Sequence, residues 1–416
     1  MRSPRTRAPP EPPLTGRALF RLPAPLARRS GGERAAFAFL LVSAVATPLM
    51  APANIALAGA AASILAWRWT ARSRGEPFLA PFRRHVPVSA PLAAFVVLSV
   101  LSCVFSTLPS RSLVELKGLT TFFFLPAVLA LVRDREDADL FLDGFRLTVL
   151  WLAGRSLVEI ASEGLNLYER ISGGTSSYMT FAGLLLALSV LLLGRALDVS
   201  RPRLSRVFDA GCGLAAAALV GLSLTRGAYI GLAAGLLVLL LLVRPRWALV
   251  VLPVVAILLL GPAPVRKRAL SAFDPSDPST RDRVLMWKAG ASMVADRPLF
   301  GLGPKRVKDL YPLYRRAGFV DPRAGHLHNN VVMLAAETGI PSAIAYLALV
   351  ASFFAGAWPI ARGGGPTAFL AAGCVGAVAA LTVAGLTEYN FGDVEVLRLL
   401  LVLLALPFAA KSGVPP

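Results

Sequence analysis

The sequence predicts an all-α protein that spans a membrane many times. Of its 416 residues, 56% are hydrophobic and only 16% are charged, whereas a soluble domain has about 25% charged residues. Many apolar runs approach the roughly 20 residues that a helix needs to cross the hydrocarbon core of a bilayer. We therefore expect a polytopic membrane protein with about twelve transmembrane helices and one long extracytoplasmic loop that contains amphipathic helices.

The apolar runs follow one another with short connections, except for one long polar stretch. The first two form a hairpin that turns at Pro48 and Pro52. The polar stretch, 263–339, separates the ninth run from the tenth. The expected spans are 35–50, 53–67, 88–105, 116–132, 141–162, 178–194, 208–224, 227–243, 246–262, 340–360, 366–387 and 394–410.

The positions of the basic residues predict the orientation. The formal net charge is +19, and Lys and Arg concentrate in alternate connections, which is the positive-inside pattern. Both ends are then cytosolic: a basic, Pro-rich tail, 1–34, predicted to be disordered, and the C-terminus 411–416. The basic connections carry Arg68, Arg72, Arg74, Arg83, Arg84, Arg133, Arg135, Arg195, Arg201, Arg203, Arg206, Arg244 and Arg246.

Charge and cysteine patterns exclude several classes of function. The basic residues flank apolar runs, which favours contact with membrane lipids and argues against nucleic acid. Cys103, Cys212 and Cys374 lie far apart inside apolar segments. They have no spacing typical of zinc ligands or of a disulfide framework.

The stretch STRDRVLMWKAGASMVADRPLFGLG at 279–303 predicts an amphipathic helix on the membrane surface. Its expected apolar face has helical spacing and consists of Val284, Leu285, Trp287, Ala291 and Val294. Ser279 or Thr280 is expected to cap it. Arg281 and Arg283 fall in its first turn, where the helix dipole disfavours cations unless an anion is bound there. Arginine forms forked hydrogen bonds to phosphate oxygens. A solvated charge cluster is the alternative interpretation.

Arg226 lies in the stretch SLTRGAYIG, inside an apolar region from 208 to 243 that is too long for one span. A tight external turn between two helices, with Arg226 at the interface, resolves the length. An ionisable group at such depth predicts a functional site. The alternative is an arginine that reaches the lipid headgroups.

The stretch RAGHLHNN at 323–330 contains His326 and His328. No Cys, Asp or Glu stands at a ligand spacing, so the pattern disfavours a metal site. A neutral imidazole is suited to accept a proton from a sugar hydroxyl. Asn329 and Asn330 are expected to orient a ring or to hold hydroxyl groups. A structural role at a loop-to-helix junction is the alternative.

Acidic residues near this stretch complete the candidate site. Glu337 closes the helical piece after the histidines, and it either caps or pairs with an arginine, with an acid role in chemistry less favoured. A later external cluster is expected to balance the basic surface or to help bind the acceptor. Its members are Glu388, Asn390, Asp393 and Glu395.

Three blocks resemble the signature of the O-antigen ligase family, which also includes O-antigen polymerases and bacterial protein O-oligosaccharyltransferases. The similarity covers roughly 220–350. The blocks are SLTRGAYIGL, RDRVLMWKAGASMVADRPLFGLG and HLHNNVVMLAAETGIPSAIAYL.

The resemblance implies a membrane glycosyltransferase, similar to the type C fold, that needs neither metal nor cofactor. It would act at the periplasmic face of the bacterial inner membrane, moving a glycan from undecaprenyl pyrophosphate to an acceptor hydroxyl. Arg226 and Arg283, with Arg281 as a substitute, would hold the pyrophosphate. His328, with His326 beside it, would activate the acceptor. Direct attack at the anomeric carbon would invert its configuration.

The sequence also fits several alternative functions. Basic clusters in the external stretch suit an anionic lipid A-core acceptor and favour a ligase over a polymerase that lengthens a carrier-bound glycan. Protein glycosylation is less favoured, because no further large soluble domain follows. A transporter or flippase is the more distant alternative, with Arg155 and Glu159 as its candidate intramembrane pair. A structural membrane protein would not require the arginines and histidines.

Overall fold

All the regular structure in the described chain is helical. The computed structural model describes residues 23–164, 170–243, 266–267, 277–316, 318 and 325–411. Within these ranges no strand occurs, and six helices are long and apolar enough to cross a membrane. The predicted all-α polytopic fold is confirmed. The predicted span 246–262 lies outside the described residues, and the total of about twelve spans stays a prediction.

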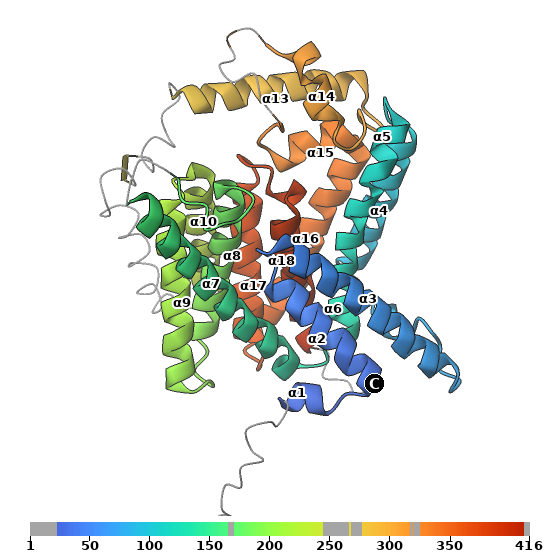
Figure 1. Ribbon diagram of the computed structural model, residues 1–416, viewed down its shortest axis with the longest axis vertical. Coiled ribbons are helices and arrows are strands. Elements are labelled where there is room, and N and C mark those ends of the chain that lie inside the picture. Colours follow the sequence, from blue (N-terminus) through green and yellow to red (C-terminus); the bar gives the residue numbers. More distant parts are fainter. Residues whose placement is uncertain are drawn as a thin grey trace, which may run out of the picture.

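The first part of the chain forms two helical groups, one on each side of the molecule (Figure 1). On one side are the elements α2 (Gly31–Val45), α3 (Met50–Arg72), η2 (Ala80–Arg83), α4 (Ser89–Val104), α5 (Pro109–Val114), η3 (Glu115–Phe123) and α6 (Phe124–Leu131). On the other side are α7 (Arg135–Glu163), α8 (Tyr178–Ala196), α9 (Arg203–Leu222) and α10 (Arg226–Val243).

The last helices pack between these groups. They are α16 (Ile340–Arg362), α17 (Ala368–Ala384) and α18 (Val394–Lys411). α17 contacts both α8 and α10, and α18 contacts α6. A Cβ at Gly194 of α8 would lie 2.7 Å from the Cα of Gly373 in α17, so these backbones approach through small residues, as helices in membranes commonly do.

Three helices cover one end of the bundle. They are α13 (Pro278–Asp296), α14 (Arg306–Tyr314) and α15 (Asn330–Thr338), at the top of Figure 1. We call this end the capped end. The short helix α1 (Ala24–Ala27) lies at the opposite end, shown at the bottom of Figure 1. Two buried methionines of α13, Met286 and Met293, pack with Leu327 and Met333 in a small core of their own.

The amphipathic helix forms, but two details of its prediction are wrong. Asp277, and not Ser279 or Thr280, caps α13: its Oδ1 accepts hydrogen bonds from the Ser279 and Thr280 N–H groups at 3.0 and 3.3 Å. Pro278 explains this, since proline favours the first position of a helix. The buried face carries Met286, Ala289, Gly290 and Met293, because α13 packs on α15.

Two N-terminal predictions also need correction. The tail was predicted to be disordered through residue 34, yet the described part from residue 23 is ordered. Arg29 is buried there and pairs with Glu33 at 2.6 Å and with Asp137 at 2.5 Å. The first hairpin turns before Met50, so that Pro52 lies in the first turn of α3, where it needs no N–H partner.

The predicted span 116–132 is not one continuous α-helix. It passes through the 3₁₀ segment η3 before α6 begins at Phe124. Gly118, Thr120 and Thr121 lie in η3, and all three are weak α-helix formers. Long 3₁₀ stretches are uncommon and often mark functional positions.

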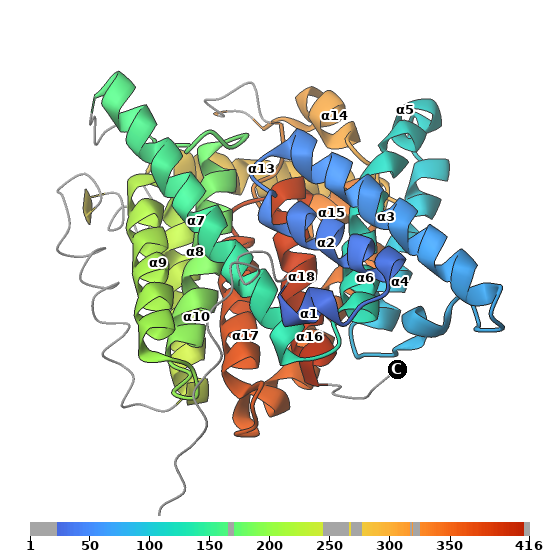
Figure 2. The same ribbon diagram turned by 60° about the horizontal axis from the view of Figure 1, so that its bottom comes forward.

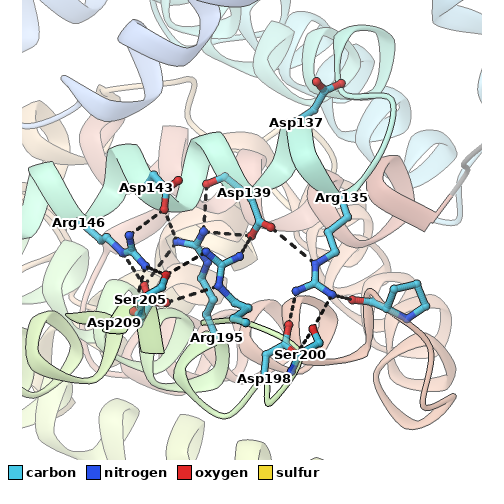
Figure 3. A network of polar contacts seen from close by, with 12 residues as sticks. Arg135, Asp137, Asp139, Asp143, Arg146, Arg195, Asp198, Ser200, Ser205 and Asp209 are labelled. Carbon is cyan, nitrogen blue, oxygen red and sulfur yellow. Dashed lines mark hydrogen bonds and ion pairs between the residues drawn. The ribbon is translucent and has the colours of Figure 1, made fainter. Parts of the chain in front are cut away.

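A network of ion pairs joins α7, α8 and α9 (Figure 3). It lies near the end of α8 and the start of α9, away from the cap (Figure 1). α7 runs obliquely across α8 and α9 (Figure 2). Arg195 of α8 pairs with Asp143 of α7 at 2.8 Å and lies 3.4 Å from the Asp209 carboxylate of α9. Arg146 of α7 donates to the same Asp209 at 2.7 Å. Basic connections that are separate in sequence therefore lie together at this end.

Candidate active site

The two clustered histidines lie at the entry to α15. Their ring centroids are 4.1 Å apart. Leu327, between them, is fully buried in the small core under the cap. Its carbonyl accepts a hydrogen bond from the Trp287 indole of α13 at 3.0 Å. The burial of Leu327 fixes the backbone here and therefore the positions of the two histidines next to it.

Glu388 joins a histidine to an arginine. It lies in the turn between α17 and α18 and is only 6% exposed. Its Oε2 is 2.9 Å from His328 Nδ1, and its Oε1 accepts from Arg283 Nη2 at 2.5 Å. The carboxylate therefore holds residues from α13 and from the start of α15 against the turn before α18.

The environment keeps the Glu388 carboxyl ionised. Burial opposes ionisation, but the hydrogen bond from His328 and the charge of Arg283 outweigh it and lower the pKa of Glu388 below its usual value. An ionised carboxylate accepts hydrogen bonds only. It therefore favours the His328 tautomer with a proton on Nδ1, which leaves Nε2 as the acceptor of that ring.

Arg226 begins α10, and the two helices around it confirm the predicted turn. α9 ends at Leu222 and α10 starts at Arg226. The arginine is 3% exposed and forms an ion pair with Asp277 at 2.9 Å. Asp277 also caps α13, so this one carboxylate ties Arg226 to the start of α13.

Two cavities border these groups, and Glu388 lines both of them. The smaller, which we call the arginine cavity, has a volume of about 230 Å³ and is lined by Arg170, Arg226, Arg283, His328 and Glu388, among others. The larger, which we call the lysine cavity, has a volume of about 540 Å³. Its lining includes Lys305, Lys308, His326, Glu337 and Glu388.

The comparison with known families covers most of this site. A family model described as O-antigen ligase matches residues 210–347. Residues 210–347 belong to the O-antigen ligase family. No curated protein sequence matches the chain. The match supports a membrane glycosyltransferase of the O-antigen ligase or polymerase type, with a lipid-linked glycan donor and a lipid acceptor in general terms.

The matched region contains the arginines and histidines singled out in the sequence, but these residues do not all line the same cavity. Arg226, Arg283 and His328 line one cavity. Arg281 is exposed on α13, so of the two first-turn arginines it is Arg283 that reaches Glu388. His326 lines the lysine cavity instead.

The two histidines differ in environment within the O-antigen ligase region. Burial, with the neighbouring His328 and nearby cations, lowers the pKa of His326 to about 4. His326 Nδ1 has no hydrogen-bond partner among the described residues. His328 instead has a carboxylate partner, Glu388, which fixes the orientation of its ring.

The two asparagines join the start of α15 to the turn before α18. Asn329 caps α15 by accepting from the Val332 N–H at 3.0 Å, and donates to the Leu386 carbonyl at 2.8 Å. Asn330 donates to Asn390 Oδ1 at 2.7 Å. Both tie α15 to the turn that carries Glu388. Burial raises the pKa of Glu337 to about 7, although Lys305 opposes the shift.

The GLG turn of the O-antigen ligase region also fixes α15. The N–H groups of Leu302 and Gly303 donate to the carbonyls of Ala336 and Glu337 at 2.8 and 2.9 Å. Gly301 has φ +66°, and a Cβ there would lie 2.4 Å from the Glu337 carbonyl carbon. Only glycine fits this approach.

Sequence reasoning missed partners that come from distant segments. Glu388 was seen only as one member of an acidic cluster, and it lies beyond the family match. Arg170, which stacks over the Tyr178 ring at 4.2 Å, and Asp277 were not singled out. A usable signal for Asp277 was its place directly before a proline at a helix start.

Backbone strain clusters around the candidate site. Within the described ranges, three residues other than glycine have positive φ: Leu224 at 50°, Lys305 at 61° and His328 at 47°. Leu224 and His328 line the arginine cavity, and Lys305 lines the lysine cavity. Such conformations cost about 1–3 kcal/mol each and persist where the surroundings enforce them, often at functional sites.

The geometry also bears on a metal site and on the candidate transporter pair, Arg155 and Glu159. Among the described residues, no group of three or more His, Cys, Asp or Glu side chains is placed to hold a metal ion. Glu159, the acid of the candidate transporter pair, accepts hydrogen bonds from the backbone N–H groups of Ser172 and Gly173 at 3.0 and 2.8 Å. It fixes a turn at the end of α7.

Proposed function

We propose that the protein transfers an O-antigen or similar glycan from undecaprenyl pyrophosphate to a hydroxyl of a lipid A-core acceptor. The observation that carries this proposal is the Glu388 carboxylate, which bridges His328 and Arg283. It sets a proton acceptor beside a phosphate-binding group, and glycosyl transfer from a pyrophosphate requires both.

His328 acts as the base. Its Nε2 takes the proton of the acceptor hydroxyl while Glu388 holds the Nδ1 proton. The acceptor oxygen forms a bond to the anomeric carbon as the bond from that carbon to the phosphate oxygen breaks. The electron pair leaves with undecaprenyl pyrophosphate, and the configuration at the anomeric carbon inverts.

The arginine cavity holds the pyrophosphate. Arg226, Arg283 and Arg170 line it. A guanidinium has five N–H donors, so the ion pairs of Arg226 with Asp277 and of Arg283 with Glu388 use only part of their capacity. Arginine charge stabilises the leaving group, and this chemistry does not call for a metal ion or a cofactor.

The acceptor enters from the lysine cavity, which Glu388 also lines. Lys305 and Lys308 line that cavity and suit an anionic acceptor, which favours a ligase over a polymerase. We place the capped end at the periplasmic side of the bacterial inner membrane, with both termini in the cytosol. The basic connections at the opposite end support that orientation.

Reconstitution tests the proposal. The purified protein is given undecaprenyl-pyrophosphate glycan and truncated lipopolysaccharide. Transfer should be lost in His328→Ala and in Arg283→Gln, whereas the matched control Arg281→Gln, at an exposed arginine two residues earlier in α13, should retain it. Unchanged transfer in His328→Ala would remove the assigned base.

The product separates the two branches of the family. A ligase adds the glycan to lipid A-core, whereas a polymerase lengthens the glycan on its carrier. Carrier-linked chains that grow while lipid A-core stays unmodified would overturn the ligase assignment. The glycosyltransferase chemistry at His328 would then still hold.

A further inference from the structure

A third cavity, with a volume of about 860 Å³, opens between α3, α4, η3 and α18. Its wall is largely apolar and includes Leu57, Phe95, Phe122 and Leu397. The lysine cavity shares several of its lining residues: Met50, Lys305, Glu337, Tyr389, Gly392 and Val394. The apolar space therefore borders the polar chamber in which we place the acceptor.

One charged side chain in this wall has unused hydrogen-bonding capacity. Arg398 lies near the start of α18 and is 1% exposed. Its Nη2 donates to Asn54 Oδ1 of α3. Its Nε and Nη1 have no hydrogen-bond partner among the described residues. A buried guanidinium with unpaired N–H groups is costly in a membrane-spanning bundle, so its presence requires a compensating anion or acceptor.

The other charged groups of the cavity do not meet that requirement. Lys117 and Lys305 add positive charge to the lining, and Glu115 and Glu337 add acids. No ion pair joins either acid to Arg398 within the described residues. Burial raises the pKa of Glu337 to about 7, so about half of this carboxyl is protonated at neutral pH and more of it below. The two lysines equal these two acids in number, so Arg398 leaves the lining with a positive charge in excess.

We propose that this cavity, the Arg398 cavity, binds an anionic lipid. Its phosphate accepts hydrogen bonds from Arg398, and its acyl chains lie against Leu57, Phe95 and Phe122. The occupant enters from the membrane, because the wall is built by membrane-type helices and is mostly apolar. That this lipid is the acceptor rests on the proposed function, which assigns the adjoining lysine cavity to acceptor entry.

Lipid binding can be measured without any glycan donor, so it stands or fails separately from the transferase assignment. The full chain in neutral detergent is titrated with phosphatidylglycerol, with diacylglycerol of the same chains, and with inorganic phosphate, and its Tm is recorded. We expect phosphatidylglycerol to raise the Tm with concentration, as a ligand of the folded state does. Diacylglycerol should raise it less, and inorganic phosphate should leave it unchanged.

Variants assign the effect to the cavity. Arg398→Gln should weaken the phosphatidylglycerol response about tenfold or more, because a charge-assisted hydrogen bond is lost. Arg111→Gln, which removes an exposed arginine of α5, should keep the response. Ala58→Phe places a large side chain in the Arg398 cavity from an exposed position of α3 and leaves Arg398 unchanged. It should also weaken the phosphatidylglycerol response, and it tests the site if Arg398→Gln does not fold.

Three outcomes would overturn the proposal. The first is a wild-type Tm that does not respond to phosphatidylglycerol. The second is an equal response in the wild type, Arg398→Gln and Ala58→Phe. The third is an equal shift with inorganic phosphate alone, which would indicate a soluble anion site instead of a lipid site. Loss of glycan transfer with normal lipid binding would count against the proposed function only.

Discussion

At the scale of single residues, Glu388 joins the two candidate functional groups of the site. It holds His328 at 2.9 Å and Arg283 at 2.5 Å. Removing its charge therefore affects both His328 and Arg283. An amide in its place can donate to Nδ1 of His328, which favours the opposite tautomer.

We therefore predict that Glu388→Gln lowers kcat for glycan transfer by about 100-fold or more, a magnitude typical of lost base catalysis. KM for the donor should change less, because Arg226 and Arg170 remain in the arginine cavity. Initial rates over a range of donor concentrations check this split. Asp309→Asn, which removes a surface acid paired with Arg111, is the control and should keep the wild-type rate.

A second residue-scale prediction concerns pH. Burial lowers the pKa of His326 from 6.5 to about 4. Below pH 6.5 the unfolded chain binds a proton at this residue that the native state does not bind, so stability falls as the pH drops from about 6.5 to about 4. The difference of about 2.5 pKa units corresponds to at most about 3 kcal/mol.

The change His326→Gln should flatten this acid loss, which thermal unfolding at several pH values between 4 and 7.5 will measure. His85→Gln, at an exposed histidine away from the site, serves as the control and should follow the wild-type curve. If His326→Gln loses as much stability at low pH as the wild type, the buried neutral histidine is not the cause.

At the scale of elements, the buried network that joins α7, α8 and α9 depends on one carboxylate. Asp209 is 0% exposed. It accepts from Arg146 at 2.7 Å and pairs with Arg195 at 3.4 Å. Breaking a buried ion pair leaves charge without compensation, which costs about 3–5 kcal/mol.

Asp209→Asn should therefore reduce the free energy of unfolding by about 3–5 kcal/mol. Asp143→Asn is the matched control: Asp143 contacts the same two arginines, but its side chain is 45% exposed. Exposed pairs contribute about 1 kcal/mol or less. Thermal unfolding in detergent compares the variants, and equal losses would show that burial does not set the energy of this network.

The helices could be predicted from the sequence, whereas the side-chain contacts between them could not. Hydropathy and the position of Arg226 predicted α9 and α10, because membrane spans need length and a charge marks their turn. The 3.6-residue period predicted α13. No local pattern, however, states that Glu388 lies against Arg283, which is 105 positions earlier in the chain. That contact depends on how α13, α15 and the turn before α18 pack.

At the scale of the whole molecule, orientation is the main open prediction. The capped end and the end with the ion-pair network should face opposite sides of the membrane. A variant without Cys103, Cys212 and Cys374 provides a background for single cysteines. Lys288→Cys places a thiol on α13 in the cap, and Arg203→Cys places one at the start of α9.

An impermeant thiol reagent should label Lys288→Cys in spheroplasts, and should label Arg203→Cys only after the membrane is opened. Mass spectrometry of the purified protein reads the labelling. The reverse pattern would place the cap in the cytosol and contradict a periplasmic site.

The place of Glu388 outside residues 210–347 has a consequence for exchanging parts between relatives. A chimera that received only the matched region would carry the arginines and histidines of one protein and the carboxylate loop of another. We expect the rate of such a chimera to depend more on the turn of the recipient protein than on the matched region of the donor protein. We therefore expect substitutions in the 385–393 turn to change turnover while every motif of the matched region stays intact.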